Sequence, residues 1–516
     1  MRKTVILISC FLAIAVMTQA MTPDAEISPA ERQRAAARSA DPDWSTPVNV
    51  SNTGSDSFTP RVGVDKDGAA YVLWTDWTDV PQIVYFKTNR GGTWSGIQTV
   101  HRMSYQSGEA CFPEFVTSPE GVCHLVLQDV IQSYEILYYQ FKDNVWKGPE
   151  NVSSNAEGAS IYSSIAISPV DDSVYSVWMD EVSSEWDLMS SYRDEETTFG
   201  WDWPFLIPLF GGYQYFPNVA VDGQGTLHLV FHTRDGENSS VWYVKNETPR
   251  NNAGWTSPVP VASNTGTEWC YPRIASDDNG DVAVVWNGRT AAGNLDVFLR
   301  RTVNGAWQAT ENVSQASDNS AGVCVAVNRE TGDIYVSWHE LVNDIWQVLF
   351  KSFEAERTGG EKKWSEVFNL SNSPRFAAYP RMAVNEEGDV HVVYSDRKSG
   401  VFDVYHTFKA KIRIYPPVNA TLTTSFNKVL FYTEKINTIT FEENPENDPS
   451  MVTGYNIYRK EADESNDKFV LLATLDTSTF LYDDRRLPHD VKYAYAVTTT
   501  DVDGNESKID EIVTEQ

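Results

Sequence analysis

The chain has 516 residues, of which 41% are hydrophobic and 12% aromatic, and it contains 17 tryptophans. This composition excludes a largely disordered protein, and the length suffices for about two to four domains. The formal net charge of -30 disfavours nucleic acid as a partner, although a local basic pocket remains compatible with it.

Residues 1–20 have the pattern of a secretory signal peptide. Two basic residues precede an apolar run, and a small-residue cleavage site ends at Ala20. A lipoprotein cleavage box ending at Cys10 is the alternative, but its apolar core is short for that use. We therefore expect a signal peptide over residues 1–20, a polar linker over residues 21–43, and a secreted protein that is extracellular or periplasmic. No later run is long enough to be a transmembrane segment.

Residues 44–411 contain a unit of about 50 residues that recurs seven times. Its clearest element alternates β-branched and aromatic residues after a turn rich in Asp, Asn and Gly, as in AAYVLW, TLHLVF, DVAVVW and DVHVVY. A third strand follows, and then a tryptophan that leads a fourth. Four short antiparallel strands in seven copies predict an all-β fold, a seven-bladed β-propeller.

The tryptophan-led fourth strands indicate how the ring closes. They begin at seven positions, which are Trp44, Trp94, Trp146, Trp201, Trp255, Trp307 and Trp364. The first of them precedes any first strand, whereas the last copy has no such strand after it. We therefore predict that residues 44–51 pair with the last blade near residues 402–409, because closure by the N-terminal strand leaves no open sheet edge.

A Pro-Arg phrase recurs where the first strand of a blade begins. The first strand of a propeller blade is innermost, so this position borders the central channel. Blade by blade, the residue there is Arg61, Glu114, Ser164, Asn218, Arg273, Cys324 and Arg381. Only three of the seven copies carry arginine, so the arginine is not a requirement of the repeated blade structure. We predict that these three arginines bind a ligand.

The residues just past each second strand lie at the same end of the blades. We predict that four of them, Arg234, Arg289, Arg397 and Trp77, also bind ligand, together with Trp269 beside a Pro-Arg site. His232, His339 and Glu340 are candidates for catalysis, without an assigned role. The carboxylates at these positions, Asp76, Asp129, Asp180 and Asp396, are interpreted as structural. Ion pairing between blades is the alternative explanation for the arginines.

The residue types on this face favour an acidic glycan as the ligand. Planar guanidinium groups match carboxylate or sulfate, and tryptophan offers an apolar face to a sugar ring. We therefore predict a carbohydrate-recognition protein. The alternatives are an enzyme acting on acidic polysaccharide, as lyase or hydrolase, and a module that assembles with an extracellular protein.

No cofactor and no metal site are expected. The acidic turns lack the bidentate glutamate of a calcium loop, and the cysteines match no zinc pattern. We interpret Cys111, Cys123, Cys270 and Cys324 as small buried apolar side chains, and leave their disulfide state open.

The turn KTNRGGTW resembles the Asp-box of sialidase-type propellers. Gly91, Thr93 and Trp94 match the family pattern, whereas Lys87 and Asn89 replace its Ser and Asp. The resemblance implies the propeller fold. It also implies that the three Pro-Arg arginines hold a substrate carboxylate, as the sialidase arginines do.

Two features depart from the sialidase pattern, since the chain has seven repeats rather than six and no tyrosine–glutamate nucleophile pair can be assigned. The chain is also similar to seven-bladed lyases of acidic polysaccharides, in which a His or Tyr accepts the proton. That similarity implies a role for His232 beside Arg273.

Residues 412–516 resemble a fibronectin type III domain. The segments VTGYNIYRK, LLATL and LPHDVKYAYAVTTTD carry the resemblance, and Leu487 and Tyr493 match its tyrosine corner, whose hydroxyl bonds back to the backbone. The resemblance implies a β-sandwich that serves as a spacer or adhesion module.

Overall fold

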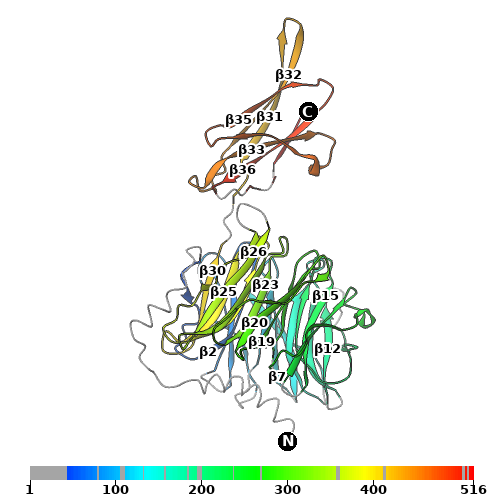
Figure 1. Cartoon of the computed structure of the whole chain (residues 1–516), viewed down its shortest axis with the longest axis vertical. Helices are drawn as coiled ribbons and strands as arrows, with labels where there is room; N and C mark the ends of the chain where they lie inside the picture. Colours follow the sequence, from blue (N-terminus) through cyan, green and yellow to red (C-terminus); the bar gives the residue numbers. More distant parts are fainter. Residues whose placement is uncertain are drawn as a thin grey trace. The chain divides into compact units, whose positions relative to one another are not determined.

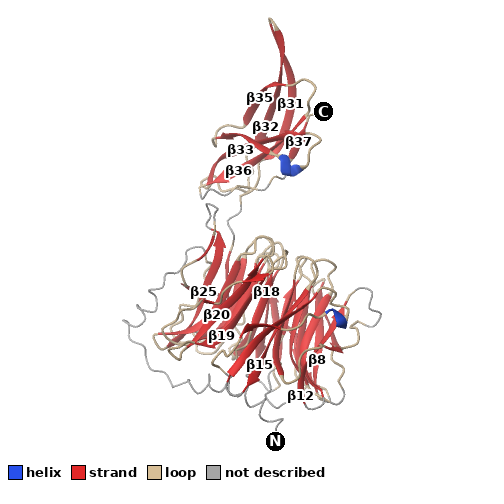
Figure 2. Cartoon of the chain, turned by 45° about the vertical axis from the view of Figure 1, so that its right-hand side comes forward, coloured by secondary structure: helices blue, strands red, loops and turns tan. Residues whose placement is uncertain are grey.

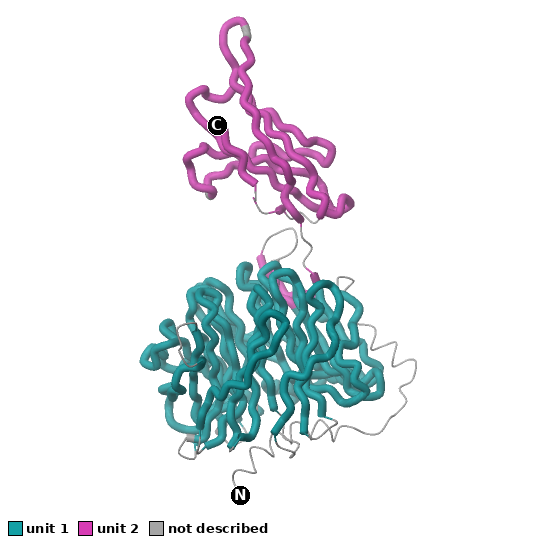
Figure 3. The backbone as a smooth tube through the Cα atoms, turned by 180° about the vertical axis from the view of Figure 1, so that it is seen from behind, with its two compact units in different colours: residues 1–351, 366–409 teal, residues 352–365, 410–516 magenta. Residues whose placement is uncertain are grey.

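A computed structural model describes residues 44–515 of the chain, except 78–80, 105–110, 132, 156–157, 183–184, 195–199, 236–237, 268–269, 356–360, 411–413, 503–505, 508 and 510. The expected signal peptide and polar linker lie outside the described residues, as does Trp269. Two compact units result, one of residues 1–351 and 366–409 and the other of residues 352–365 and 410–516 (Figure 3).

Seven antiparallel sheets follow one another between residues 48 and 409, and their strands lie in the first unit except for residues 352–355 and 362–364 (Figures 1 and 2). The first four blades follow chain order. Blade 1 contains β2 (Ser57–Val64), β3 (Ala70–Asp76), β4 (Ile83–Thr88) and β5 (Gln98–Arg102), and blade 2 contains β6 (Glu114–Thr117), β7 (Cys123–Val130), β8 (Tyr134–Lys142) and β9 (Val145–Asn151). Blade 3 contains β10 (Ser160–Ile167), β11 (Val174–Val182), β12 (Glu185–Arg193) and β13 (Phe205–Leu206), and blade 4 contains β14 (Gln214–Val221), β15 (Leu227–Asp235), β16 (Asn238–Asn246) and β17 (Val259–Ala262). A short 3-10 helix, η1 (Asn252–Gly254), precedes β17.

The remaining three blades complete the ring. Blade 5 contains β18 (Arg273–Ser276), β19 (Val282–Arg289), β20 (Leu295–Val303), β21 (Ala306–Trp307) and β22 (Glu311–Asn312). Blade 6 contains β23 (Ser320–Val327), β24 (Ile334–Val342), β25 (Ile345–Ala355), β26 (Lys362–Trp364) and β27 (Phe368–Asn369), and blade 7 contains β28 (Ala377–Val384), β29 (Val390–Asp396), β30 (Asp403–Lys409) and β1 (Val48–Asn49). The first strands of adjacent blades contact one another all the way round, including β28 with β2. The seven-bladed propeller predicted from the repeat is confirmed.

The closure predicted from the tryptophan positions is also confirmed. Val48 and Asn49 of β1 pair with His406 and Tyr405 of β30, and Trp44 forms a bridge with Lys409. The outer strands are shorter than the sequence suggests. Trp255, for example, makes a single bridge to Asn246 before regular pairing begins at Val259. An outermost strand has a neighbour on one side only, so its pairing is the least constrained.

The core lies between neighbouring blades and explains most of the tryptophans. The second strands carry Trp74, Trp178, Trp286 and Trp338 two to four residues before their ends, and these side chains are at most 3% exposed. The apolar alternation of one sheet packs against the next, as where Phe86 of blade 1 meets Phe141 of blade 2 with ring centroids 4.8 Å apart. The four described cysteines are buried and free, as interpreted from the sequence.

The second unit contains a two-sheet sandwich. One sheet has the order β31 (Val418–Val429), β32 (Tyr432–Glu442), β35 (Leu481–Leu487). The other has the order β34 (Val470–Leu475), β33 (Val452–Glu461), β36 (Tyr493–Asp501), β37 (Ile512–Thr514), and η2 (Asn466–Lys468) is a short 3-10 helix. This all-β sandwich agrees with the fibronectin type III resemblance. The predicted domain boundary at 411 and 412 falls on residues outside the described part.

The tyrosine corner differs from expectation. The Tyr493 hydroxyl makes no hydrogen bond with the described residues. The Tyr493 ring instead lies near two cations, with its centroid 4.7 Å from Arg459 Cζ and 5.9 Å from Lys435 Nζ. These two cationic groups thus lie over the Tyr493 ring.

Candidate functional site

Every blade has the same irregularity at the start of its first strand. The residue before the proline position has a left-handed backbone in all seven copies, with φ between 38° and 61°: Thr59, Phe112, Tyr162, Phe216, Tyr271, Gly322 and Tyr379. In five blades the pairing with the second strand shifts register across this residue and the next. This is a β-bulge, which bends the strand and redirects a side chain.

Five of the seven bulge residues are aromatic, although bulky residues rarely adopt a positive φ. Four of these rings form a continuous arc across blades 2 to 5. The centroid distances along it are 4.9 Å from Phe112 to Tyr162, 4.5 Å from Tyr162 to Phe216 and 4.8 Å from Phe216 to Tyr271. Backbone strain of this kind gathers at sites that hold ligands. We call these four side chains the aromatic arc.

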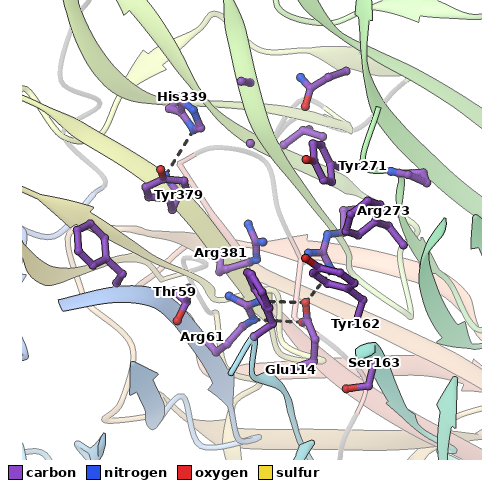
Figure 4. A pocket seen from close by; sticks show the side chains of 18 of the residues that line it. Thr59, Arg61, Glu114, Tyr162, Ser163, Tyr271, Arg273, His339, Tyr379 and Arg381 are labelled. Atoms are coloured by element: carbon purple, nitrogen blue, oxygen red, sulfur yellow. Dashed lines mark hydrogen bonds and ion pairs between the residues drawn. The ribbon is translucent and has the colours of Figure 1, made fainter. Parts of the chain in front are cut away.

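The aromatic arc forms one wall of a cavity of about 370 Å³ at the channel end where the first strands begin (Figure 4). This volume is at the lower end of the range typical of small-molecule sites. Three arginines line the same cavity, Arg61, Arg273 and Arg381. The structure therefore brings together the three Pro-Arg arginines, which the sequence placed on one rim.

Glu114 occupies the equivalent position in blade 2 and pairs with two of these arginines. Its Oε1 accepts from Arg61 Nη2 and from Arg273 Nη1, each at 3.0 Å, and its Oε2 accepts from Arg61 Nε at 3.1 Å. Burial alone would raise the pKa of the Glu114 carboxyl, but Arg273, Arg61 and Arg381 outweigh burial and hold it at about 2. Ion pairing between blades, the alternative weighed from the sequence, therefore accounts for Arg61 and Arg273.

Arg381 differs from the other two arginines because it has no carboxylate partner among the described residues. Its Nη1 donates to the carbonyl oxygen of Pro380 at 2.8 Å, and its buried Nε makes no hydrogen bond within the described part of the chain. Burial, together with repulsion from Arg61 and Arg273, lowers the Arg381 pKa. Three guanidinium groups thus face one carboxylate, and the cavity has an uncompensated positive charge.

Blade 6 has glycine where the other blades have a side chain, and this glycine brings a histidine into the cavity. A Cβ at Gly322 would lie 2.2 Å from Cε1 of His339, so only glycine leaves room for the imidazole. His339 lines the cavity, and its Nδ1 is 3.4 Å from the backbone nitrogen of Tyr379. Burial, followed by the charge of Arg381, lowers the His339 pKa to about 3.

The other predicted site residues fall into two groups. Trp77 lines the cavity and packs against Phe58 with centroids 5.3 Å apart. Arg234, Arg289 and Arg397 do not line it: the first two are exposed, and Arg397 lies over Phe402 at 5.9 Å. The structure thus brings Trp77 into the cavity with the three Pro-Arg arginines and leaves Arg234, Arg289 and Arg397 outside its lining.

His232 and Glu340, two of the catalytic candidates, also stay outside the cavity lining. His232 is buried behind Phe216, with ring centroids 5.4 Å apart. Glu340 accepts hydrogen bonds from Trp338 Nε1 at 3.0 Å and from Ser320 Oγ at 3.3 Å. The sequence could not separate His232 from His339, since both follow an aromatic residue near the end of a second strand.

Glu340 belongs to a set of carboxylates that join strands. Asp76, Asp129, Asp180 and Asp396 each accept a hydrogen bond from a serine near the start of the blade or the preceding loop: Ser55, Ser104, Ser160 and Ser373. Asp180 also accepts from Trp178 Nε1 at 3.0 Å, as Glu340 does from Trp338. The structural interpretation of these aspartates is consistent with the geometry and extends to Glu340.

The aromatic arc is the part of the site that sequence reasoning missed. Four aromatic residues directly precede a proline of the Pro-Arg position, namely Phe112, Phe216, Tyr271 and Tyr379, and this recurrence was the available signal. A residue before proline is expected to have an extended backbone, so the recurrence did not by itself indicate the left-handed conformation.

No group of three or more His, Cys, Asp or Glu side chains is arranged to hold a metal within the described residues. None of the helices in that part of the chain has the length and hydropathy needed to span a bilayer. The cavity therefore offers guanidinium groups, one carboxylate, one imidazole and aromatic rings as its chemistry.

Comparison with known proteins finds distant structural similarity. No family model matches the chain, and no curated protein matches it. An ulvan lyase has a TM-score of 0.48 at 10% identity, over 70% of this chain and 95% of that one. A protein of unknown function from Dyadobacter fermentans has a TM-score of 0.41 at 12% identity, over 72% and 100%. The NanB sialidase of Streptococcus pneumoniae has a TM-score of 0.40 at 10% identity, over 75% and 73%.

Proposed function

We propose that the propeller recognises an acidic saccharide and binds it in the cavity, with the acid group on Arg381 and a sugar face against the aromatic arc. The observation that carries the proposal is the guanidinium group of Arg381, which lies in the cavity with no carboxylate partner among the described residues. A buried cation without a counter-ion is costly, so an anionic ligand would stabilise it.

The different pairing of the three arginines supports the binding of a single acid group. Arg61 and Arg273 are already engaged by Glu114, which fixes their positions and neutralises one charge. Arg381 retains Nε and Nη2 as donors, a pair whose planar arrangement fits a carboxylate or sulfate. The aromatic arc adds apolar faces of the kind that pack against the C–H groups of sugar rings.

Recognition is better supported than catalysis by the state of the cavity's proton-transfer groups. The His339 pKa of about 3 makes the imidazole a weak proton acceptor, and burial raises the pKa of the Tyr379 hydroxyl far above neutrality. Efficient general bases have a pKa near the working pH. A lyase that uses His339 is the second candidate, because this imidazole lines the cavity within reach of a bound uronate.

The experiment is a binding titration with glucuronate-terminated oligosaccharides and their neutral glucose-terminated counterparts. We expect measurable binding of the acidic set only. Arg381→Ala should weaken it about 10- to 100-fold, the effect of losing a charge-assisted hydrogen bond. Arg289→Ala is the matched control, since Arg289 is exposed outside the cavity and should leave binding unchanged.

Equal binding of acidic and neutral sugars, or unchanged affinity in Arg381→Ala, would contradict the proposal. The same mixtures test the lyase alternative through the ultraviolet absorbance of an unsaturated uronate. If that product accumulates with the wild type and not with His339→Ala, the propeller is an enzyme rather than a recognition module.

A further inference from the structure

The hairpin of β31 and β32 in the second unit ends in a cluster of exposed apolar side chains. Val429 pairs with Tyr432, so Leu430 and Phe431 form the entire connection between the strands. Leu430 is 89% exposed and Phe431 is 91% exposed, and Phe426 and Tyr432 beside them are each 56% exposed. We call Phe426, Leu430, Phe431 and Tyr432 the hairpin tip.

The hairpin tip extends beyond the sheet that supports the rest of the hairpin. The neighbouring strand β35 pairs with β32 only between Lys435 and Thr440. The part of the hairpin past Lys435 is therefore a ribbon of two strands to which no third strand pairs among the described residues, and it projects from its own unit (Figure 3). A two-stranded ribbon of this kind has only marginal stability by itself in water.

The chemistry of the connection is the reverse of what a hairpin turn requires. Two-residue turns ordinarily contain Asn, Asp or Gly, and exposed turns are polar. Here two large apolar side chains occupy the turn and are almost fully exposed to water. Local folding gains nothing from them, and a contiguous exposed apolar cluster of this kind marks a binding surface.

The size of the hairpin tip distinguishes between possible occupants. Four side chains of this type expose on the order of 500 Å². A stable protein interface buries about 800 Å² on each partner, with shape complementarity over a broad patch. A lipid bilayer requires neither, because apolar and aromatic side chains gain free energy wherever they enter the interfacial region.

The charge beside the hairpin tip also fits a lipid surface. The chain as a whole has a net charge of -30, which would be repelled by anionic headgroups. The ionisable residues of the ribbon are Lys428, Glu434 and Lys435, two lysines against one glutamate. Glu434 and Lys435 are both buried, and Lys435 forms an ion pair with Glu515 at 2.6 Å, whereas Lys428 is exposed next to the tip. The exposed charge beside the hairpin tip is thus the cation of Lys428, on a protein that is acidic overall.

We propose that the hairpin tip inserts into the headgroup and outer hydrocarbon region of a lipid bilayer, and so attaches the protein peripherally to a membrane surface. Leu430 and Phe431 are the inserting side chains, Phe426 and Tyr432 lie at the interface, and Lys428 contacts phosphate. One tip provides weak and reversible attachment, since stable anchoring takes more than one such signal. This attachment is independent of the propeller cavity.

Vesicle flotation tests the proposal with the chain from residue 21 onward and vesicles of phosphatidylcholine, with and without phosphatidylglycerol. We expect the wild type to float with vesicles and Leu430→Ser/Phe431→Ser to lose at least 10-fold in the bound fraction. The matched control is Val470→Ser/Leu471→Ser, which removes two apolar side chains that are 64% and 48% exposed on β34. It should float as the wild type does.

A fluorescent label gives a second readout that does not depend on removing the tip. Because the four described cysteines are buried, an added surface cysteine can be labelled selectively. An environment-sensitive dye at Asn427→Cys should shift to the blue when vesicles are added, and the same dye at Thr477→Cys should not, because Thr477 lies on an exposed turn of the same unit.

Three results would overturn the proposal. They are a wild type that stays in solution, a Leu430→Ser/Phe431→Ser variant that floats normally, and a dye at position 427 that does not respond to vesicles. Self-association in lipid-free buffer that disappears in the Leu430→Ser/Phe431→Ser variant would instead identify a second copy of the chain as the occupant.

Discussion

Blades 4 and 6 carry the same residue at the same place and use it differently. His232 and His339 each follow an aromatic residue within a second strand, and each is at most 2% exposed. In blade 4 the ring of Phe216 lies between the imidazole and the cavity, whereas in blade 6 Gly322 leaves the imidazole on the cavity wall. One bulge residue therefore decides which histidine a ligand can approach.

The largest effect is expected from closing the gap in blade 6. Gly322→Phe introduces the blade 4 residue where an added Cβ would already lie 2.2 Å from His339, so we expect the free energy of unfolding to fall by about 3 kcal/mol. Chemical denaturation followed by tryptophan fluorescence measures it. A cost below about 1 kcal/mol would show that the blade 6 imidazole moves freely.

Substitutions to alanine separate the cost of the clash with His339 from the cost of backbone strain. Gly322→Ala should cost about 2 kcal/mol, and Gly293→Ala should cost about 1 kcal/mol, because Gly293 also has a positive φ but has open space around it. In a His339→Ala background, where the clash is absent, Gly322→Ala should cost about as much as Gly293→Ala does in the wild type.

The two histidines should behave alike in acid, despite their different positions. Burial is the main cause that lowers both pKa values to about 3, against about 6.5 in the unfolded chain. Below pH of about 6.5 the unfolded state takes up protons that the folded state does not, so stability falls as the pH drops toward 3. Each histidine should account for about 3 kcal/mol of that loss at about pH 4.

Urea midpoints measured across this pH range check the acid prediction. His232→Leu and His339→Gln should each flatten the dependence of stability on pH. Unchanged slopes in both core variants would contradict a buried neutral state for these histidines.

A bound anion should distinguish the two histidines. After burial, the charge that lowers the His339 pKa is Arg381, whereas for His232 it is Arg234 outside the cavity. Glucuronate on Arg381 would neutralise only the first, so the His339 pKa should rise by about 1 unit and the His232 pKa should not change. Titration of the imidazole protons by NMR measures both. A parallel shift of the two histidines would place the anion elsewhere.

Much of the propeller followed from the sequence because blade formation is local. Period-2 apolar alternation, turns with Asp and Gly, and the leading tryptophans specify each sheet within about 50 residues. The surplus of one tryptophan-led strand at the N-terminus and its absence after the last copy specified the closure through Val48 and Asn49. The rim position of the Pro-Arg arginines followed from strand order alone.

The tertiary structure decided which of the rim residues form a site. Arg61 and Arg273 share Glu114, which is 53 positions from the first and 159 from the second, and Arg381 is left as the one of the three without a carboxylate among the described residues. The bulge gives five aromatic residues a left-handed backbone, and for the four that precede proline this opposes the usual extended preference. The residue pattern in the sequence indicates where each strand lies and which face of it is buried. Which side chains form ion pairs across the channel, and where a bulged side chain points, depend on how the seven blades pack together.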